Sequence, residues 1–186
     1  MPAERTDALE IQRKKIALLV DNLYEDLEVW YPLLRFQEEG AQVLVIAAEA
    51  GKVYQSKHGY PVKSHSSYNE LHSREFDGVI IPGGYAPDHI RRYVKATQFV
   101  YEMNEQRKLI ASICHRPWVL CSAGILKGRK ATCFFAIKDD LVNAGARYED
   151  AEVVVDGNLV TSRRPEDLTA FCRAAMRVLT AAPVMP

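Results

Sequence analysis

The sequence has no CxxC pair, no clustered histidines and no excess of either charge, and each absence excludes a class of protein. Its 186 residues include four cysteines and five histidines, without the close Cys and His spacing of a structural zinc site. Lys and Arg number 24, as do Asp and Glu, so no overall field would attract nucleic acid or an anionic membrane. We therefore expect no metal, no cofactor, no nucleic-acid partner and no membrane partner, and we look for function in a local site.

The N-terminal segment also lacks an apolar run of the length that a signal peptide or a membrane span requires. We interpret residues 1–14 as a flexible tail and expect a cytoplasmic protein. Because the cytosol is reducing, the four cysteines are expected to be free thiols. The chain has no repeats or low-complexity segments, and 48% of its residues are hydrophobic. Residues 15–180 are therefore predicted to form a single domain, followed by a short tail at 181–186.

Short apolar runs alternate with helical patterns along the chain, which is typical of a parallel sheet covered by helices. Two further segments, with alternating apolar residues or turn signals, indicate antiparallel hairpins. The predicted fold class is therefore an α/β sandwich with a mostly parallel central sheet. The predicted strands are residues 15–20, 42–47, 78–81 and 109–113, the helices are 27–39, 96–107, 116–123, 137–144 and 165–179, and the hairpins are 52–63 and 152–161.

Three predicted strand ends carry chemically useful residues. In open parallel sheets, ligands bind beyond the carboxyl ends of the strands, where neighbouring loops converge. The first strand runs into residues 21–26, the third into 82–85 and the fourth into 114–117. This edge of the sheet is thus predicted to bring together a carboxylate, a glycine-rich turn, and a thiol beside an imidazole.

Cys114 is the strongest candidate among these residues. The apolar run 109–113 stops at Cys114 and the chain resumes as a helix opened by Pro117, which is the layout of a nucleophile elbow. A helix N-terminus favours thiolate over thiol, so we predict a pKa below the ~8.5 of free cysteine. A buried structural cysteine is the alternative on residue patterns alone. The other cysteines lie in apolar surroundings and are expected to be structural: Cys121, Cys133 and Cys172.

The residues predicted to surround Cys114 have both catalytic and structural interpretations. His115 is either a general base or orienting residue, or an exposed histidine at a helix end. Glu25 could hydrogen-bond the sulfur, and sharing this pocket would raise the pKa of the Glu25 carboxyl group. Alternatively, Glu25 could serve as a first-turn acid of a helix. Gly83 and Gly84 allow the close backbone approach of an oxyanion hole, but they could equally form only a turn.

The chain contains, in this order, the segments YEDLE (24–28), FDGVIIPGG (76–84), ASICH (111–115), IKDD (137–140) and DAEVVVDGN (150–158). Together these five segments resemble the PfpI family of intracellular peptidase and deglycase-like proteins. The resemblance covers roughly residues 15–179, nearly the whole chain. It implies a flavodoxin-like fold of the class I glutamine-amidotransferase type, and self-assembly into dimers or larger rings.

The resemblance also implies a role for each matching position. It makes Cys114 the nucleophile, Glu25 the carboxyl hydrogen-bonded to its sulfur, and His115 the neighbouring imidazole. The main-chain N–H groups of Gly84 and His115 would form the oxyanion hole. In peptidase-like members an acid from an adjacent subunit completes a triad with the histidine, and the matching position here is Asp88. Further residues of the expected pocket are Gly83, Tyr85 and Arg116.

Two positions depart from the family pattern. Members commonly have glycine after the Cys-His pair, whereas this chain has Arg116, a long cation that would either recruit an acidic substrate or obstruct entry. Peptidase-like relatives have Glu where this chain has Asp88, whose side chain is one methylene shorter. The shorter side chain weakens the expected triad.

Three functions remain compatible with the sequence. The first, which we favour, is a stress-protective hydrolase of deglycase or glyoxalase type, in which the Cys114 thiolate adds to a reactive carbonyl or glycated adduct. The second is an intracellular cysteine peptidase with an intersubunit Cys-His-Asp triad. The third is a non-catalytic redox sensor that works through oxidation of Cys114.

Overall fold

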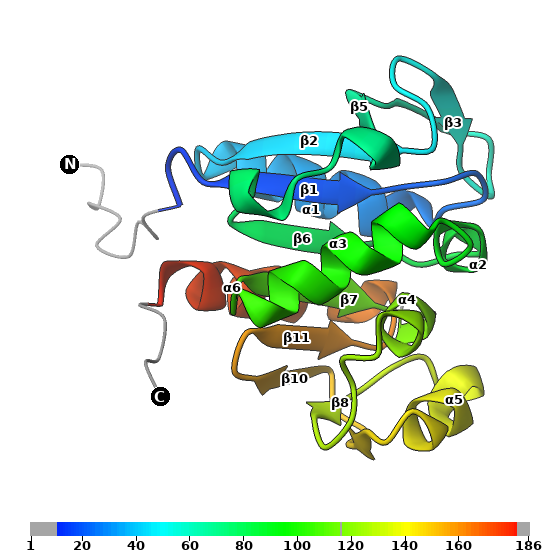
Figure 1. Ribbon diagram of the computed structural model, residues 1–186, viewed down its shortest axis with the longest axis vertical. Coiled ribbons are helices and arrows are strands. Elements are labelled where there is room, and N and C mark those ends of the chain that lie inside the picture. The colour runs from blue at the N-terminus through cyan, green and yellow to red at the C-terminus, as the bar shows by residue number, and fades with distance from the viewer. Residues whose placement is uncertain (1–10, 116, 182–186) are drawn as a thin grey trace.

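The structure, a computed structural model, describes residues 11–115 and 117–181 and has a seven-stranded sheet at its centre (Figure 1). The strand order is β10-β11-β7-β6-β1-β2-β5. Four parallel strands in the middle were predicted from their apolar runs, and this confirms the α/β sandwich. They are β1 (Lys15–Leu19), β2 (Gln42–Ala47), β6 (Gly78–Ile81) and β7 (Leu109–Ile113).

The sheet is extended at both of its edges. β11 (Leu159–Ser162) pairs in parallel with β7, and β10 (Val153–Asp156) pairs antiparallel with β11, which confirms the second predicted hairpin. At the opposite edge the two residues of β5 (Ser66–Ser67) pair in parallel with β2. The sequence did not predict β5, because two residues are too few to show a period.

Two small sheets lie outside the main one. β3 (Val53–Gln55) and β4 (Pro61–Lys63) form the first predicted hairpin. β8 (Lys130–Ala131) and β9 (Arg147–Tyr148) form a short parallel pair, which was not predicted.

Helices cover both faces of the main sheet (Figure 1). α1 and α6 pack against each other on one face, while α2, α3 and α4 lie on the other, and α5 packs against α4. Only α2 was not predicted, because its five residues are too short for a clear helical period. The helices are α1 (Asp26–Glu38), α2 (Ala86–Ile90), α3 (Val94–Glu105), α4 (Pro117–Ala123), α5 (Lys138–Asn143) and α6 (Leu168–Thr180), and the 3₁₀ turns are η1 (Tyr68–Glu70), η2 (Ser73–Glu75), η3 (Phe135–Ile137) and η4 (Pro165–Asp167).

The packed domain begins earlier than the sequence analysis indicated. Ile11 is fully buried in the core, the backbone N–H of Arg13 donates to the carbonyl of Gly40 at 3.1 Å, and Lys14 pairs with Asp77 at 3.3 Å. The predicted flexible tail is therefore wrong for residues 11–14, because the apolar side chain of Ile11 is anchored in the core. Residues 1–10 and 182–186 of the two predicted tails lie outside the described residues.

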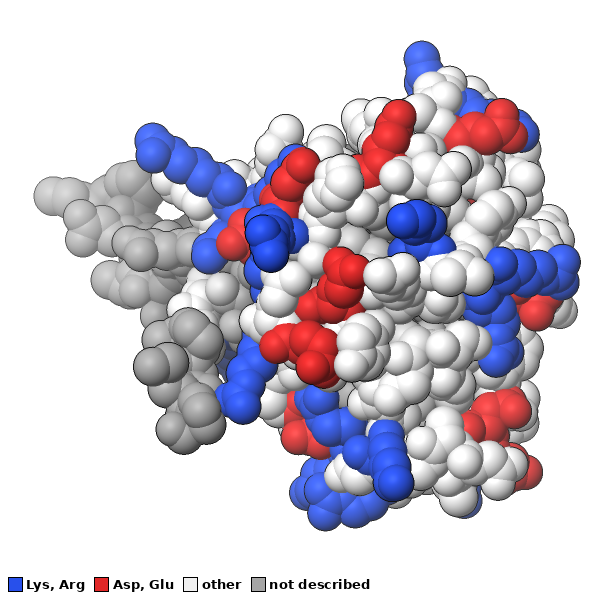
Figure 2. All heavy atoms as spheres, in the orientation of Figure 1, with Lys and Arg blue, Asp and Glu red and all other residues white. Residues whose placement is uncertain are grey.

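Two other expectations concern the cysteines and the surface. All four cysteines are free thiols, as expected. Figure 2 shows acidic and basic side chains interspersed over the visible face, in line with the equal numbers of the two charges. Within the described part of the chain, no helix is both long enough and apolar enough to cross a membrane.

Candidate active site

Cys114 lies on the turn that leads from the end of β7 toward α4. Its φ is +67°, in the left-handed region that residues other than glycine rarely occupy. The turn is held from two sides, because the N–H of Cys114 donates to the carbonyl of Ser162 and its carbonyl accepts from Phe134, both at 3.1 Å. The structure thus has the strained strand–turn–helix arrangement that the sequence predicted for Cys114.

The sulfur of Cys114 is surrounded by two backbone donors and one carboxyl group. The N–H groups of Gly84 and His115 hydrogen-bond the sulfur, and these are the two groups that the resemblance assigned to an oxyanion hole. The carboxyl group belongs to Glu28, which also hydrogen-bonds the sulfur and accepts the N–H of Gly83 at 2.5 Å. Glu28 is fully buried, so its carboxyl group is shielded from water.

The prediction that Glu25 provides this carboxyl group is wrong. The Glu25 side chain forms an ion pair with Lys57. α1 begins only after Glu25, and Glu28 lies on the buried face of that helix together with Val29 and Pro32. A charged residue on the apolar face of an amphipathic helix is unusual, and this signal could have identified Glu28 from the sequence.

Gly83 and Gly84 are both required by close packing, Gly83 against the Cys114 and Glu28 side chains and Gly84 against the backbone before α1. A Cβ atom at Gly83 would lie 2.2 Å from Oε2 of Glu28 and 2.7 Å from Cβ of Cys114. Gly84 has φ +78°, and a Cβ atom there would lie 2.4 Å from the carbonyl oxygen of Leu23. The double glycine is therefore part of the site and not only a turn.

Gly83→Ala is expected to lower the free energy of unfolding by about 1–3 kcal/mol, because the added methyl group overlaps Glu28 and Cys114. It should also displace the thiol and reduce its reactivity. Chemical denaturation and alkylation of Cys114 measure the two effects. Gly124→Ala is the control: a Cβ atom there meets nothing within 4 Å, but its φ of +72° is unfavourable for alanine, so this variant should lose stability while keeping the reactivity. Wild-type stability and reactivity in Gly83→Ala would contradict this packing.

The electrostatic environment of the thiol differs from the one expected at a helix N-terminus. Burial, followed by the charge of Glu28, raises the pKa of Cys114 well above its ordinary value. Hydrogen bonds from the N–H groups of His115 and Gly84 lower it only in part. The predicted pKa below ~8.5 is therefore wrong for the resting site. Cys114 needs a nearby group that accepts its proton during reaction, and Glu28 is in contact with it.

His115 lies beside the sulfur as a neutral imidazole. Its Nδ1 is 3.3 Å from Sγ of Cys114, and its ring packs against those of Phe134 and Trp118 at centroid distances of 4.8 and 5.6 Å. Burial, followed by the positive charge of Lys57, lowers the pKa of His115. The ring is therefore uncharged at neutral pH and can both accept and donate a proton.

The other predicted pocket residues lie at the surface. Asp88, on α2, is half-buried and pairs with Arg92, four residues further along the chain, and Tyr85 is 64% exposed. A contact between Asp88 and His115 of a neighbouring subunit stays a prediction. Arg116 lies outside the described residues.

Among the described residues, one group of side chains could hold a metal ion. It consists of Glu25, Asp26 and His58, whose ligand atoms lie within 4.8 Å of one another. Glu25 is already bound by Lys57, while Asp26 accepts from Oγ of Ser56 at 2.6 Å and lies 2.7 Å from Nδ1 of His58. These contacts connect the β3–β4 loop to the start of α1, and they already give each of the three side chains a partner other than a metal ion.

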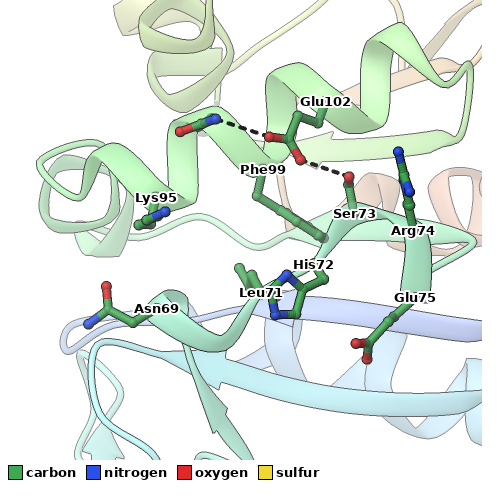
Figure 3. Close-up of a pocket in the computed structure, with 10 residues that line it drawn as sticks. Asn69, Leu71, His72, Ser73, Arg74, Glu75, Lys95, Phe99 and Glu102 are labelled. Atoms are coloured by element: carbon green, nitrogen blue, oxygen red, sulfur yellow. Dashed lines mark hydrogen bonds between the residues drawn. The ribbon is translucent and has the colours of Figure 1, made fainter.

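A separate pocket of about 500 Å³ lies between η1, η2 and α3 (Figure 3). One of its walls is polar, with Oγ of Ser73 donating to Oε2 of Glu102 at 2.7 Å. None of the residues predicted for the active site lines this pocket. It is therefore not the place where Cys114 would react.

Comparisons with known proteins agree with this geometry. The pattern of the DJ-1/PfpI family matches residues 14–178. Deglycase PfpI of Pyrococcus furiosus is 46% identical over 165 residues, which cover 89% of this chain and 99% of that protein. YraA of Bacillus subtilis, whose name describes a cysteine protease, is 43% identical over 166 residues, covering 89% and 98%. Among solved structures, a two-domain protein of Anabaena variabilis with DJ-1/ThiJ/PfpI-like and ferritin-like domains is similar with a TM-score of 0.89 at 40% identity, over 94% of this chain and 50% of that one.

Proposed function

Because the chain belongs to the DJ-1/PfpI family, we propose that it removes reactive carbonyls or glycated adducts in the cytoplasm through the thiol of Cys114. It is a stress-protective enzyme of the PfpI type, and the deglycase name of its relative supports the carbonyl chemistry. The observation that carries the proposal is a thiol on a strained turn, in contact with a buried carboxyl group and two backbone donors. The redox-sensor alternative fits less well, because the relatives' names describe enzymes.

The first step is the addition of Sγ of Cys114 to the aldehyde carbon. A C–S bond forms, the carbonyl double bond becomes an alkoxide, and the thiol proton passes to the Glu28 carboxylate. The N–H groups of Gly84 and His115, which hydrogen-bond the sulfur in the resting site, stabilise the negative oxygen. If the aldehyde is held as an amine adduct, the C–N bond breaks as the C–S bond forms, and the amine leaves with the proton from Glu28.

A 2-oxoaldehyde such as methylglyoxal then reaches its product without an external oxidant. The imidazole of His115, beside the sulfur, moves a proton from the sulfur-bearing carbon to the neighbouring carbon. The aldehyde carbon is thereby oxidised to a thioester and the ketone carbon is reduced to an alcohol, whose oxygen takes the proton that Glu28 accepted in the first step. Water then breaks the C–S bond, which releases a 2-hydroxycarboxylate and returns the thiol with its proton.

The test is amine release from a peptide modified by methylglyoxal, followed by NMR together with lactate. An enzyme that acts on the adduct releases the amine faster than the adduct dissociates by itself. An enzyme that acts only on free methylglyoxal produces lactate, but the amine appears at the spontaneous rate. Carbonyl chemistry is supported by either result, and a protein that produces no lactate would contradict the proposal.

Peptide hydrolysis is the second candidate function, favoured by the contact between the thiol and the imidazole. It requires an acidic residue that hydrogen-bonds and orients the imidazole of His115. Within one chain, the candidate Asp88 pairs with Arg92 instead. We propose that a second copy of the chain would have to bring Asp88 to His115 in an assembled dimer or larger oligomer.

Asp88→Asn is expected to lower any peptidase turnover by on the order of 10⁴, because a triad histidine needs its orienting acid. Carbonyl turnover should be unaffected, since its groups all come from one subunit. The same preparation is assayed with a fluorogenic peptide panel and with methylglyoxal, and size-exclusion chromatography confirms that assembly is intact. Equal losses in both assays would show that Asp88 also serves the carbonyl reaction.

A further inference from the structure

Lys57 is a cation at the site that the proposed reaction does not use. It lies in the loop between β3 and β4, and its backbone N–H donates to the carbonyl of Tyr24 at 3.0 Å. Tyr24 also forms isolated β-bridges with Ser56 and with Gly84. The loop, the segment before α1 and the glycine turn therefore lie side by side. In this arrangement Nζ of Lys57 forms an ion pair with Oε2 of Glu25.

The Glu25–Lys57 pair lies within electrostatic reach of the reacting groups. Lys57 interacts with the charges of Cys114 and Glu28 as well as with Glu25, and it lowers the pKa of His115. The Glu25 side chain is 11% exposed, against 39% for Lys57, so water screens the carboxylate poorly. Without Lys57, an uncompensated negative charge would remain at Glu25, whose backbone N–H donates at 3.2 Å to the carbonyl of Gly83, the residue that packs against the sulfur.

We propose that Lys57 is a positioning residue for the reaction of Cys114. Its ammonium group neutralises Glu25, and the pair thereby sets how readily the sulfur carries negative charge. The inference rests on the proposed role of Cys114 as the nucleophile. The described groups that face the thiol are Glu28 from α1 and His115 from the elbow, with Lys57 and Glu25 at the edge of the site.

The two members of the pair are expected to have opposite effects on the thiol. Lys57→Met leaves the Glu25 charge alone, so alkylation of Cys114 by iodoacetamide at neutral pH should slow by about tenfold, the effect of one pKa unit. Its pH profile should move to higher pH. Glu25→Gln leaves only the ammonium, so alkylation should become several-fold faster, with the profile at lower pH. The double variant should return close to the wild-type rate, because both charges are gone.

The rates are measured on the folded full-length protein by mass spectrometry of the peptide that contains Cys114. Lys57→Arg keeps the charge and should keep the wild-type profile. Lys52→Met is the matched control, since Lys52 immediately precedes β3 and pairs with Glu49 in the exposed part of the hairpin. It should leave the rate unchanged.

A purely structural role for the pair predicts a different pattern. Loosening of the loop would change the alkylation rate in the same direction in Lys57→Met and in Glu25→Gln. The two rate changes would then add in the double variant. That result, or an unchanged profile in Lys57→Met, would overturn the inference. A wild-type protein in which Cys121 is labelled and Cys114 is not would overturn the proposed function itself, and the inference with it.

Discussion

Cys114→Ala is expected to reduce kcat for methylglyoxal by on the order of 10⁴ or more, because the proposed covalent intermediate is a thioester of its Sγ. The loss should appear in kcat rather than in KM alone, since the C–S bond exists only after binding. Folding should be retained, because alanine is smaller than cysteine and the turn remains held by Ser162 and Phe134. Lactate production followed by NMR or by a coupled assay measures the effect.

Cys121→Ala is the matched control for this loss. Cys121 is more exposed than Cys114 but lies on α4, where its sulfur contacts the carbonyl of Asp140 at 3.7 Å. Burial raises the pKa of Cys121 to about 11, so exposure alone does not make it a nucleophile. Its removal should leave turnover unchanged. Equal turnover in wild type and Cys114→Ala would contradict the proposed mechanism.

Glu28→Gln is expected to lower kcat by about 10²–10⁴, because an amide cannot accept the thiol proton. The same substitution should accelerate alkylation of Cys114, since the charge of Glu28 is one of the causes that raise the pKa of that thiol. A more reactive thiol in a less active enzyme is a combination that simple disruption of the site does not produce. Turnover assays and the pH profile of iodoacetamide labelling measure the two effects.

The stability of Glu28→Gln provides a further check. The amide oxygen can still accept the N–H of Gly83, and burying a neutral amide costs less than burying a carboxylate. Thermal unfolding should therefore show no loss of stability. If turnover is lost in Glu25→Gln and retained in Glu28→Gln, the assignment of the two carboxylates is reversed.

The central strands of the sheet could be predicted from the sequence, because strands that are buried on both faces of a sheet have continuous apolar runs. β2 and β7 have apolar runs of the length of one strand, and the run that ends at Cys114 predicts the elbow directly. The two-residue strands β5, β8 and β9 depend on pairing with distant segments, so their own sequences carry no comparable signal.

The site residues show where sequence reasoning reaches its limit. Glu25 and Glu28 are both acids near the start of α1, and the choice between them depends on the residue at which the helix begins. The thiol pKa depends on burial by segments far apart in the chain, among them the turn at Gly83 and the first turn of α1. The sequence indicated a helix N-terminus, which lowers a thiol pKa. It did not indicate the burial of Cys114 or the nearby carboxyl group of Glu28, both of which raise that pKa.

The most direct test of the account is mass spectrometry of the Cys114 peptide in samples quenched with acid during turnover of methylglyoxal. The account predicts a 2-hydroxyacyl thioester on Cys114 that forms and decays at least as fast as lactate appears. The thioester should be absent from Cys121 and from Cys114→Ala. Lactate production at the wild-type rate with Cys114 unmodified throughout, or with the acyl group on another residue, would contradict the account.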